Sequence, residues 1–467
     1  MTAGTWPGRF AAAAWAAALA LAALLPMAVS GQVAAGPPAR LTLDEAITRA
    51  TANNPAYRQE VNNIELNEIE GRSFWLGFFP QLSVSVLNTN MQWNRTAVST
   101  DIFGNPIANP DFRMVQSATS SQRLQLNWSV ALGDYFERRA NRLRAENRLA
   151  QLSDQGEILA LDIRLNFLDA QERLEARALE ETLLEVRRAL AGLTDQRFRL
   201  GLADRVELLE AELDVVTQEN EFEQSRTNLA TIHLQLRNRI GDDSLGEFEI
   251  VPEPLRLFDP AVLDQEALVE AAGESGPAVR QARYTLADRE VGIPLARSTW
   301  LPTFSLFAST DRQEISRESG SGFLQPLPDA DWSRRFGLTI SFPDIGTWFT
   351  RQNEVRRTEL DVRNAEEALR ATGLSIREEA RRLLVELENQ YRTLRLQERR
   401  AELAAERLEL QQEYFRLGRV DYLDLQNSAE ASANALRQVL QARYAFERAL
   451  IQLERALGAP VPTPEAR

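Results

Sequence analysis

The sequence predicts a mainly α-helical protein, built twice from one structural unit, whose four β-strands belong to a membrane β-barrel. Three observations support this prediction: two long stretches free of proline, a turn motif that occurs twice, and segments in which apolar and polar residues alternate. Of the 467 residues, 44% are hydrophobic and only 7% are aromatic. Such a composition is typical of long helices rather than of all-β domains.

The two halves of the chain share one plan. The residues Arg-Phe-Arg-Leu precede Gly201 and the residues Tyr-Phe-Arg-Leu precede Gly418, and Asp204 and Asp421 follow at the same spacing. Two further pairs of segments match in the same order, namely 79–83 with 301–305 and 126–129 with 338–341. Because both the order and the spacing repeat, we interpret the chain as a tandem duplication.

The proline-free stretches lie between Pro110 and Pro252 and between Pro343 and Pro460. Proline is the residue that most reliably stops a helix. In the second stretch, apolar residues recur every seven positions, at Leu387, Leu394, Ala401, Leu408 and Phe415. This spacing predicts coiled-coil helices. A helix over residues 135–200 would be about 100 Å long, so it must pack against other helices along its length.

Turn signals divide each half further. Gly201 and Gly418 are expected to end the long helices, and Asp204 and Asp421 to cap the helices that return, which extend to about residues 240 and 457. Shorter helices are expected before the strands, over residues 41–77 and 264–299. Asn54-Pro55 and Gly276-Pro277 predict a break near the beginning of each shorter helix, and Thr42 with Glu45 forms a possible capping box.

Four segments alternate between apolar and polar residues, which predicts strands with one apolar face. The apolar positions are Leu82, Val84 and Val86; Leu124, Leu126, Trp128 and Val130; Phe304, Leu306 and Ala308; and Phe336, Leu338, Ile340 and Phe342. The alternation alone fits a soluble α+β protein and a barrel in lipid equally well. Polar stretches at 88–121 and 310–332 are interpreted as long extracellular loops, which favours the barrel.

The amino-terminal residues 1–30 are typical of a secretory signal peptide, with Arg9 before an apolar run that ends at Leu25. A membrane anchor is the alternative, although the run is short for a spanning helix. The later sequence contains no run of about 18 apolar residues. If the protein lies in a membrane, it is therefore expected to cross it as a β-barrel.

Four strands cannot close a barrel, and open sheet edges are not tolerated in lipid. Two copies would supply eight strands, whose interior is filled by side chains, whereas three copies would supply twelve strands around a channel. We favour three copies, because the helices also need several partners to enclose a lumen.

These motifs together resemble the TolC-like outer-membrane efflux protein family, also called outer membrane factors, over residues 41–458. The resemblance implies a homotrimer with a twelve-stranded barrel, and a periplasmic α-barrel of coiled-coil helices. It implies docking to a periplasmic adaptor (membrane fusion) protein and an inner-membrane pump of the RND, ABC or MFS class. The chain would lie in the outer membrane of a Gram-negative bacterium and extend into the periplasm. One departure is visible, since Pro343-Asp344 leads into the second long helix where the first half has residues 131–134.

The resulting division of the chain has five parts. They are a signal peptide at 1–30, a first repeat at 31–240, a linker or equatorial segment at 241–263, a second repeat at 264–458 and a tail at 459–467.

Function is expected in transport and not in catalysis. The net charge of −14 disfavours a nucleic-acid partner, and the absence of cysteine excludes thiolate chemistry and a lipid-modified cysteine. The lone His233 is expected to be structural. No catalytic, cofactor or metal site is expected. The predicted function is a passive exit duct of a tripartite efflux or type I secretion system, with a soluble periplasmic coiled-coil adaptor as the alternative.

The candidate sites lie beside the two turns. Five carboxylates follow the turns, and threefold symmetry would arrange them as acidic rings that gate a periplasmic aperture: Asp204, Glu207, Glu210, Asp421 and Asp424. Ordinary helix amino-terminal acids are an equally good interpretation. Four residues of the turns themselves are candidate adaptor contacts: Leu200, Gly201, Leu417 and Gly418.

Overall fold

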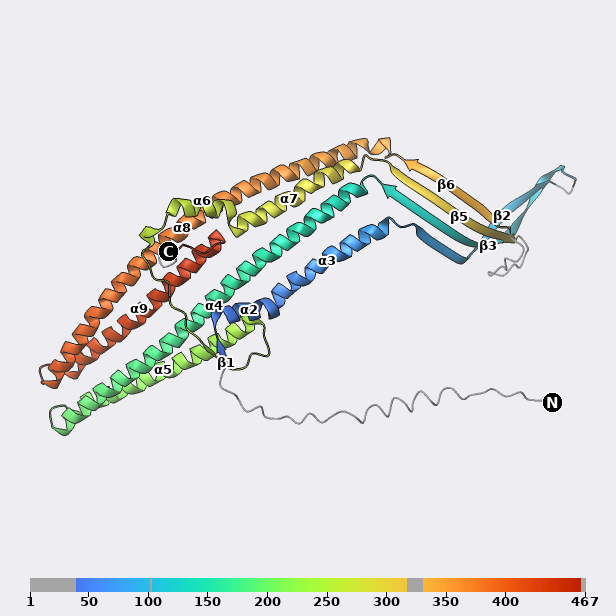
Figure 1. Cartoon of the computed structure of the whole chain (residues 1–467). Helices are drawn as coiled ribbons and strands as arrows, with labels where there is room; N and C mark the ends of the chain where they lie inside the picture. Colours follow the sequence, from blue (N-terminus) through green and yellow to red (C-terminus); the bar gives the residue numbers. More distant parts are fainter. Residues whose placement is uncertain (1–38, 101–102, 317–330, 463–467) are drawn as a thin grey trace, which may run out of the picture.

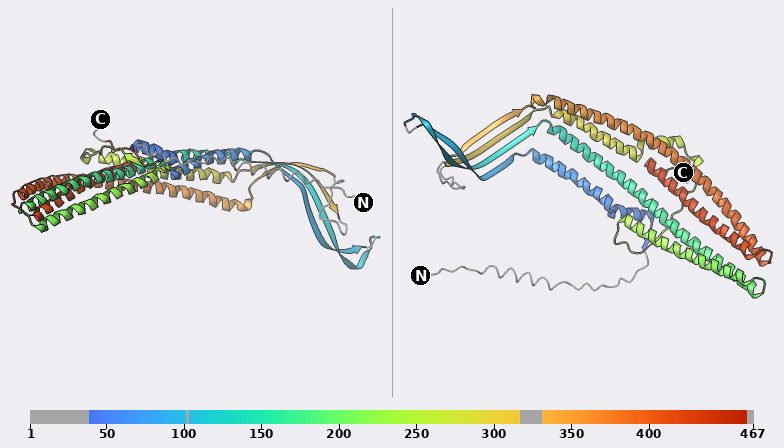
Figure 2. Two further views of the ribbon diagram at one scale, coloured as in Figure 1. Left: turned by 90° about the horizontal axis from the view of Figure 1, so that it is seen from below. Right: turned by 180° about the vertical axis from the view of Figure 1, so that it is seen from behind.

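The computed structural model describes residues 39–100, 103–316 and 331–462, and these form one elongated body (Figure 1). Long helices make up most of its length, and a four-stranded sheet lies at one end. Two helical hairpins end side by side at the other end, as the views of Figure 2 confirm. The predicted signal peptide, 1–30, and residues 463–467 of the tail lie outside the described residues.

The first repeat contains a short strand, two short helices, two long strands and a long helical hairpin. In order these are β1 (Ala39–Leu41), α2 (Leu43–Asn53), α3 (Pro55–Gly77), β2 (Gln81–Thr100), β3 (Pro106–Ala131), α4 (Asp134–Arg199) and α5 (Arg205–Ile240). Helix α4 has 66 residues, which corresponds to about 100 Å. The predicted long helix is therefore present.

The second repeat follows the same order after a connecting segment. Its elements are β4 (Phe248–Ile250), η1 (Pro260–Val262), α6 (Gln265–Ser275), α7 (Pro277–Ser298), β5 (Thr303–Ser316), β6 (Ser333–Ser341), η2 (Ile345–Thr347), α8 (Trp348–Arg416) and α9 (Tyr422–Leu457). The junctions that lead from the strands into the long helices differ between the repeats, as the sequence predicts. Asp134 accepts a hydrogen bond from the Ala131 amide directly before α4, whereas the short helix η2 precedes α8.

Helix boundaries coincide with the predicted signals. The Thr42 hydroxyl accepts a hydrogen bond from the Glu45 amide at 3.3 Å and begins α2. Pro55 and Pro277 begin α3 and α7, because neither residue can continue the preceding helix. Gly241 and Gly458 end α5 and α9 in the left-handed conformation, with φ of 75° and 70°.

The sheet has the strand order β2-β3-β5-β6, and all neighbours are antiparallel. The prediction of a loop at 88–121 is wrong for most of these residues, since β2 and β3 remain paired as far as Thr100 opposite Pro106. A register shift lies between Ser85 and Asn88, and beyond it the strands stay paired although their side chains are mainly polar. Polar residues here form a long hairpin instead of a loop. In the expected loop 310–332, β5 extends to Ser316 and residues 317–330 lie outside the described ranges.

The lower part of the sheet has the predicted two faces. Register places Leu82 beside Leu126 and Leu306 beside Leu338 on one face. All four side chains are exposed in the single chain. An apolar face of this kind needs a non-aqueous neighbour.

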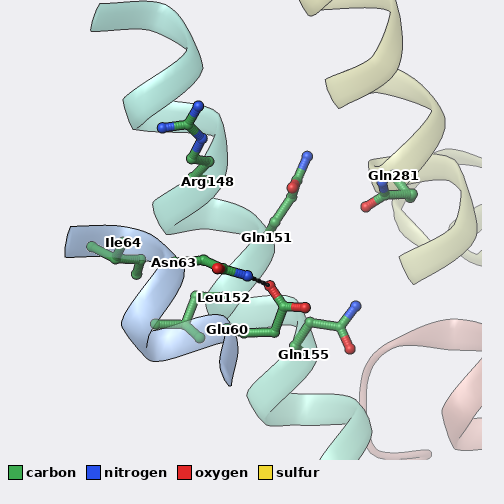
Figure 3. Close-up of a pocket in the computed structure, with 8 residues that line it drawn as sticks. All are labelled: Glu60, Asn63, Ile64, Arg148, Gln151, Leu152, Gln155 and Gln281. Carbon is green, nitrogen blue, oxygen red and sulfur yellow. Dashed lines mark hydrogen bonds between the residues drawn. The ribbon is translucent and has the colours of Figure 1, made fainter. Parts of the chain in front are cut away.

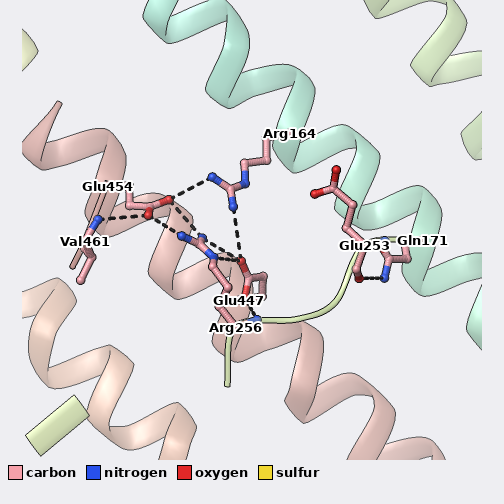
Figure 4. A network of polar contacts seen from close by, with 7 residues as sticks. All are labelled: Arg164, Gln171, Glu253, Arg256, Glu447, Glu454 and Val461. Carbon is pink, nitrogen blue, oxygen red and sulfur yellow. Dashed lines mark hydrogen bonds and ion pairs between the residues drawn. The ribbon is translucent and has the colours of Figure 1, made fainter. Parts of the chain in front are cut away.

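The segment between the repeats is better ordered than a linker. Strand β4 pairs in parallel with β1, and Ile250 and Leu41 are buried in one apolar cluster with residues of α4 and α5. Farther along, Arg256 donates to the carboxylates of Glu447 and Glu454, which are almost fully buried in α9 (Figure 4). Arg164 of α4 lies 3.5 Å from Glu454. The two buried charges are thus paired, as burial requires, and the segment is fixed to both repeats.

Ion pairs join the two repeats along α4 and α9. The pairs are Glu180 with Arg437 at 2.7 Å, Asp169 with Arg448 at 2.9 Å and Asp162 with Arg455 at 3.0 Å. Although burial opposes ionisation, hydrogen bonds from Arg437 and Gln218 lower the pKa of the Glu180 carboxyl. We call this row of ion pairs, together with the contact between Arg448 and Glu172, the ionic ladder.

Gly241 offers a test of this packing, because alanine there would adopt a left-handed conformation and place Cβ 2.8 Å from Pro55 Cδ. We expect Gly241→Ala to destabilise the fold by about 1–2 kcal/mol from the backbone alone. Thermal unfolding in detergent at one scan rate measures the effect. The matched control is Gly246→Ala, where a Cβ would meet nothing within 4 Å. Equal melting temperatures for the two variants would contradict the role given to Gly241.

Candidate functional site at the hairpin tips

The two hairpin turns have the same backbone geometry. The Gly201 amide donates to Phe198 and the Leu202 amide to Arg197, at 2.9 and 2.8 Å. The second turn repeats this pair of bonds, from Gly418 to Phe415 and from Arg419 to Tyr414, at 3.0 and 2.9 Å. Both glycines have φ near 70°. Each long helix therefore ends in a Schellman motif, which only glycine accommodates without strain.

The predicted cap residues begin the returning helices. Asp204 accepts a hydrogen bond from the Glu207 amide at 2.8 Å, and Asp421 accepts one from the Asp424 amide at 3.0 Å. These bonds satisfy amides that the first turn of a helix leaves free. The carboxylates of Asp204 and Asp421 therefore have a structural role, as the helix-terminus interpretation of the acids requires.

The remaining carboxylates of the candidate set surround the turns. Asp424 and Glu210 are exposed, and Glu207 is half-buried with one oxygen enclosed and unbonded. In the described part of the chain, none of the five candidate carboxylates forms an ion pair. The charges of the exposed Glu210 and Asp424 are consequently available to the solvent or to another molecule.

Apolar side chains project from the turns. Leu200 is 73% exposed, and Leu202 and Leu417 are also exposed. Large apolar residues at the end of a molecule suit contact with another protein. The structure thus brings the predicted contact residues of the two repeats to one end of the body.

An arginine connects the two turns. Arg197 of α4 donates hydrogen bonds to the carbonyl oxygens of Phe415 and Leu202. Its guanidinium also lies over the ring of Phe415, 4.0 Å from the centroid. Because the matching position of the second repeat is Tyr414, this contact exists in one direction only. The first turn therefore holds the second.

A second connection between the two hairpins lies in the helices next to the turns. Asp214 of α5 accepts hydrogen bonds from the Tyr422 hydroxyl at 3.0 Å and from Gln426 at 2.7 Å, both in α9. Arg187 of α4 donates to the same carboxylate at 3.2 Å, and both partners are largely buried. Burial and the neighbouring Asp214 raise the pKa of Tyr422 well above its usual value. We call Asp214, Tyr422, Gln426 and Arg187 the tip cluster; it fixes the two hairpins to each other.

Other parts of the described chain offer little chemistry. The pocket drawn in Figure 3 lies between α3, α4 and α7 and is lined by amides and charged groups, such as Glu60, which accepts a bond from Asn63 at 3.4 Å. Among the described residues, no group of three His, Cys, Asp or Glu side chains could hold a metal ion. His233 stacks on Phe248 at 4.9 Å, and burial lowers its pKa. Its surroundings fit a structural role.

The long helices are rich in charged residues. Within the described ranges, no helix combines the length and the apolarity that a transmembrane span needs.

Comparisons with known proteins agree with the architecture. Residues 268–459 match the family model described as outer membrane efflux protein. No curated protein sequence matches the chain. Among solved structures, CusC superposes with a TM-score of 0.67 at 16% identity, covering 89% of this chain and 92% of CusC. The CmeC outer membrane channel of Campylobacter jejuni gives 0.67 at 13% identity, covering 90% and 86%. A membrane protein from Pseudomonas aeruginosa gives 0.65 at 20% identity, covering 90% of each chain.

The chain has the fold of solved outer-membrane channels, and the predicted combination of long helices with a sheet portion is confirmed. The second repeat thus matches the model of the family that the sequence motifs resemble.

Sequence reasoning did not find the tip cluster or Arg197. Their partners are about 200 residues apart in the chain, for example Asp214 and Tyr422, so no local pattern marks them. The repeated motif held one clue, because Arg197 and Tyr414 occupy matching positions but differ in charge.

The tip cluster predicts a local change in dynamics. Asp214→Asn keeps the side-chain shape but removes the charge that Arg187 and Tyr422 contact, which weakens the contact by about 1.5–3 kcal/mol. Amide hydrogen exchange over 422–429 should accelerate by about tenfold or more. The control is Glu219→Gln, which removes the exposed ion pair with the adjacent Arg188 and is worth at most about 1 kcal/mol. If the two variants exchange alike, the cluster does not hold the hairpins together.

Proposed function

We propose that the chain is one protomer of a homotrimeric exit duct, through which solutes pass from a periplasmic pump assembly to the exterior. The observation that carries the proposal is that both the sheet and the helical part of the chain have edges without a partner. Strand β2 and strand β6 each pair on one side only within the described sheet. Backbone amides and carbonyls at such edges cannot remain unpaired in lipid.

The helices have corresponding edges. In both figures that draw the whole chain, α8 lies along one side, and α3 with α5 along the other (Figures 1 and 2). Helix α5 exposes an apolar stripe at steps of three and four residues: Val206, Leu209, Leu213 and Val216. Helix α8 exposes a second stripe: Leu374, Val385, Leu396, Leu403 and Leu410. The α5 spacing is that of a coiled-coil seam. The α8 residues recur in steps of eleven and seven, which keeps them on one side of the helix, and each stripe needs a partner.

A second copy supplies both missing partners. Each copy ends on one side in elements of the first repeat, β2, α3 and α5, and on the other side in β6 and α8. Joining the first-repeat side of one copy to the second-repeat side of the next preserves the antiparallel order of the strands, because β2 and β6 run in opposite directions. Such a head-to-tail contact closes into a ring. Three four-stranded sheets give twelve strands, enough for an open channel, whereas two give the side-chain-filled eight.

The proposed partners rest on the match to the outer membrane efflux protein model and on the exposed residues at the hairpin tips. We propose that the exposed apolar turn residues, with Leu200, Gly201, Leu417 and Gly418 as the candidates, contact a periplasmic adaptor protein. An inner-membrane pump of the RND, ABC or MFS class would supply the energy, while the duct itself transports passively and catalyses nothing. Division into repeats at 31–240 and 264–458, joined by 241–263, is retained as part of this proposal.

The ring can be tested by cross-linking, because the chain has no cysteine of its own. Leu213 of α5 and Leu410 of α8 lie at similar distances from their turns on the two apolar stripes. A Leu213→Cys/Leu410→Cys variant, oxidised in membranes, should give covalent dimers and trimers on denaturing gels. Leu213→Cys alone is the control and should not form trimers. Cross-linked products that end at the dimer, or that extend beyond the trimer, would contradict threefold closure.

The acidic rings need a separate test. We propose that Asp204, Glu207, Glu210, Asp421 and Asp424 concentrate cations at the periplasmic aperture. Asp424→Ala suits the test, because Asp421 rather than Asp424 provides the cap. In planar bilayers the variant should lose cation preference and block by divalent ions. The control is Asp243→Ala, which removes an exposed carboxylate far from the turns. Unchanged preference and block in Asp424→Ala would leave these acids as helix-terminal groups only.

A further inference from the structure

Where all four strands of the sheet are paired, charged side chains occur at one level only of the polar face. In the paired lower part, the register joins Arg123 of β3 to Asp311 of β5, and Arg335 of β6 to Ser309. Residues that pair across antiparallel strands share a face, so Arg123, Asp311 and Arg335 lie together. The other polar-face residues there are uncharged, among them Ser83, Ser85, Gln125, Asn127, Ser305, Thr339 and Ser341.

These three residues carry a net positive charge. The Arg335 guanidinium forms an ion pair with Asp311 at 2.6 Å, and the Asp311 side chain is only 13% exposed, against 58% for Arg335. Arg123 lies directly opposite Asp311 on the other neighbouring strand and is exposed. One carboxylate therefore faces two guanidinium groups, and one positive charge per chain is uncompensated within this group.

Two further arginines at this level lie on the opposite, apolar face. Arg312 pairs in register with Gln122, donates to its amide oxygen at 2.8 Å and lies over the ring of Trp332, 5.1 Å from the centroid. Arg334 pairs in register with Thr310 and is exposed. Arg312 and Arg334 mark where the apolar part of this face ends. Because they alternate with the polar-face residues, they also provide charge-matched controls on the other side of the same strands.

We propose that Arg123 and Arg335, with Asp311 between them, form a basic ring that lines the pore near its outer end and favours anions there. The proposal rests on the trimeric duct, in which the polar face lines the lumen and three copies repeat the group around the axis. Counted along β5 from Thr303 to Asp311, the ring lies about 27 Å from the helical end of the sheet. The exit would thus favour solutes of the opposite sign from those attracted by the acidic tips.

The local field gives the size of the effect. A positive ring in a narrow channel with low-dielectric walls raises the local concentration of anions, by a factor of about three for each kT of potential. Salt screens the ring, so the preference should weaken as ionic strength rises above about 0.1 M.

The experiment is the reversal potential of the full-length protein in planar bilayers under a KCl gradient. We expect the Arg123→Gln/Arg335→Gln variant to raise the permeability of potassium relative to chloride by a factor of at least about three over the unsubstituted protein. The Arg312→Gln/Arg334→Gln variant removes the same charge from the outer face of the same strands. It should leave the ratio unchanged.

The outcomes separate the ring from the duct. A protein that conducts, with equal permeability ratios in the unsubstituted protein and the Arg123→Gln/Arg335→Gln variant, would overturn the ring and leave the duct intact. An equal shift in both double variants would also overturn it, since position on the pore face would then not matter. A protein that inserts but never conducts would contradict the proposed function, and the ring with it. Cross-linked trimer yields of the variants should match the unsubstituted protein, which excludes misassembly as a cause.

Discussion

Unpaired backbone groups at the edges of a sheet are the constraint on which the rest of this molecule depends. In the proposed membrane location, lipid offers no hydrogen bonds to the outer amides and carbonyls of β2 and β6, and four strands are too few to pair these edges with each other. The sheet of a single chain is therefore incomplete by itself. On the proposed arrangement, each copy completes its neighbour, and the helices below extend the same curved wall with the apolar stripes of α5 and α8 at its seams.

The contacts inside the protomer differ in kind from those proposed between protomers. Within the chain, the two repeats meet through the ionic ladder, the tip cluster and the buried pairs of Arg256 with Glu447 and Glu454. Buried ion pairs stabilise little compared with apolar packing, but they are costly to break when one partner is left alone. They therefore fix the position of one repeat against the other. The free edges, by contrast, present mainly leucine and valine, which provide association energy with less demand on geometry.

Much of the fold could be predicted because it is encoded by local signals. The caps Asp204 and Asp421, the glycines after the long helices, and the breaks at Pro55 and Pro277 each depend on residues within one helical turn of each other. The duplication strengthened every one of these signals by repeating it. The length of the β2–β3 hairpin could not be predicted, because its polar strands are held by backbone pairing, for which side-chain alternation is no guide. The pairing of β1 with β4 and the tip cluster join segments about 200 residues apart, so neither leaves a local pattern.

The spacing of the ionic ladder has a mechanical consequence. Eleven positions separate Arg437 from Arg448 in α9 and Asp169 from Glu180 in α4. The next step, to Arg455 and Asp162, is seven positions in both helices. A seven-residue period winds helices to the left and an eleven-residue period winds them slightly to the right. One step of each length spans 18 residues, from Arg437 to Arg455, and 18 residues are about five whole turns of a straight α-helix. The ladder therefore stays on one face of α9 without any supercoil, so α9 can run straight beside α4 instead of winding around it.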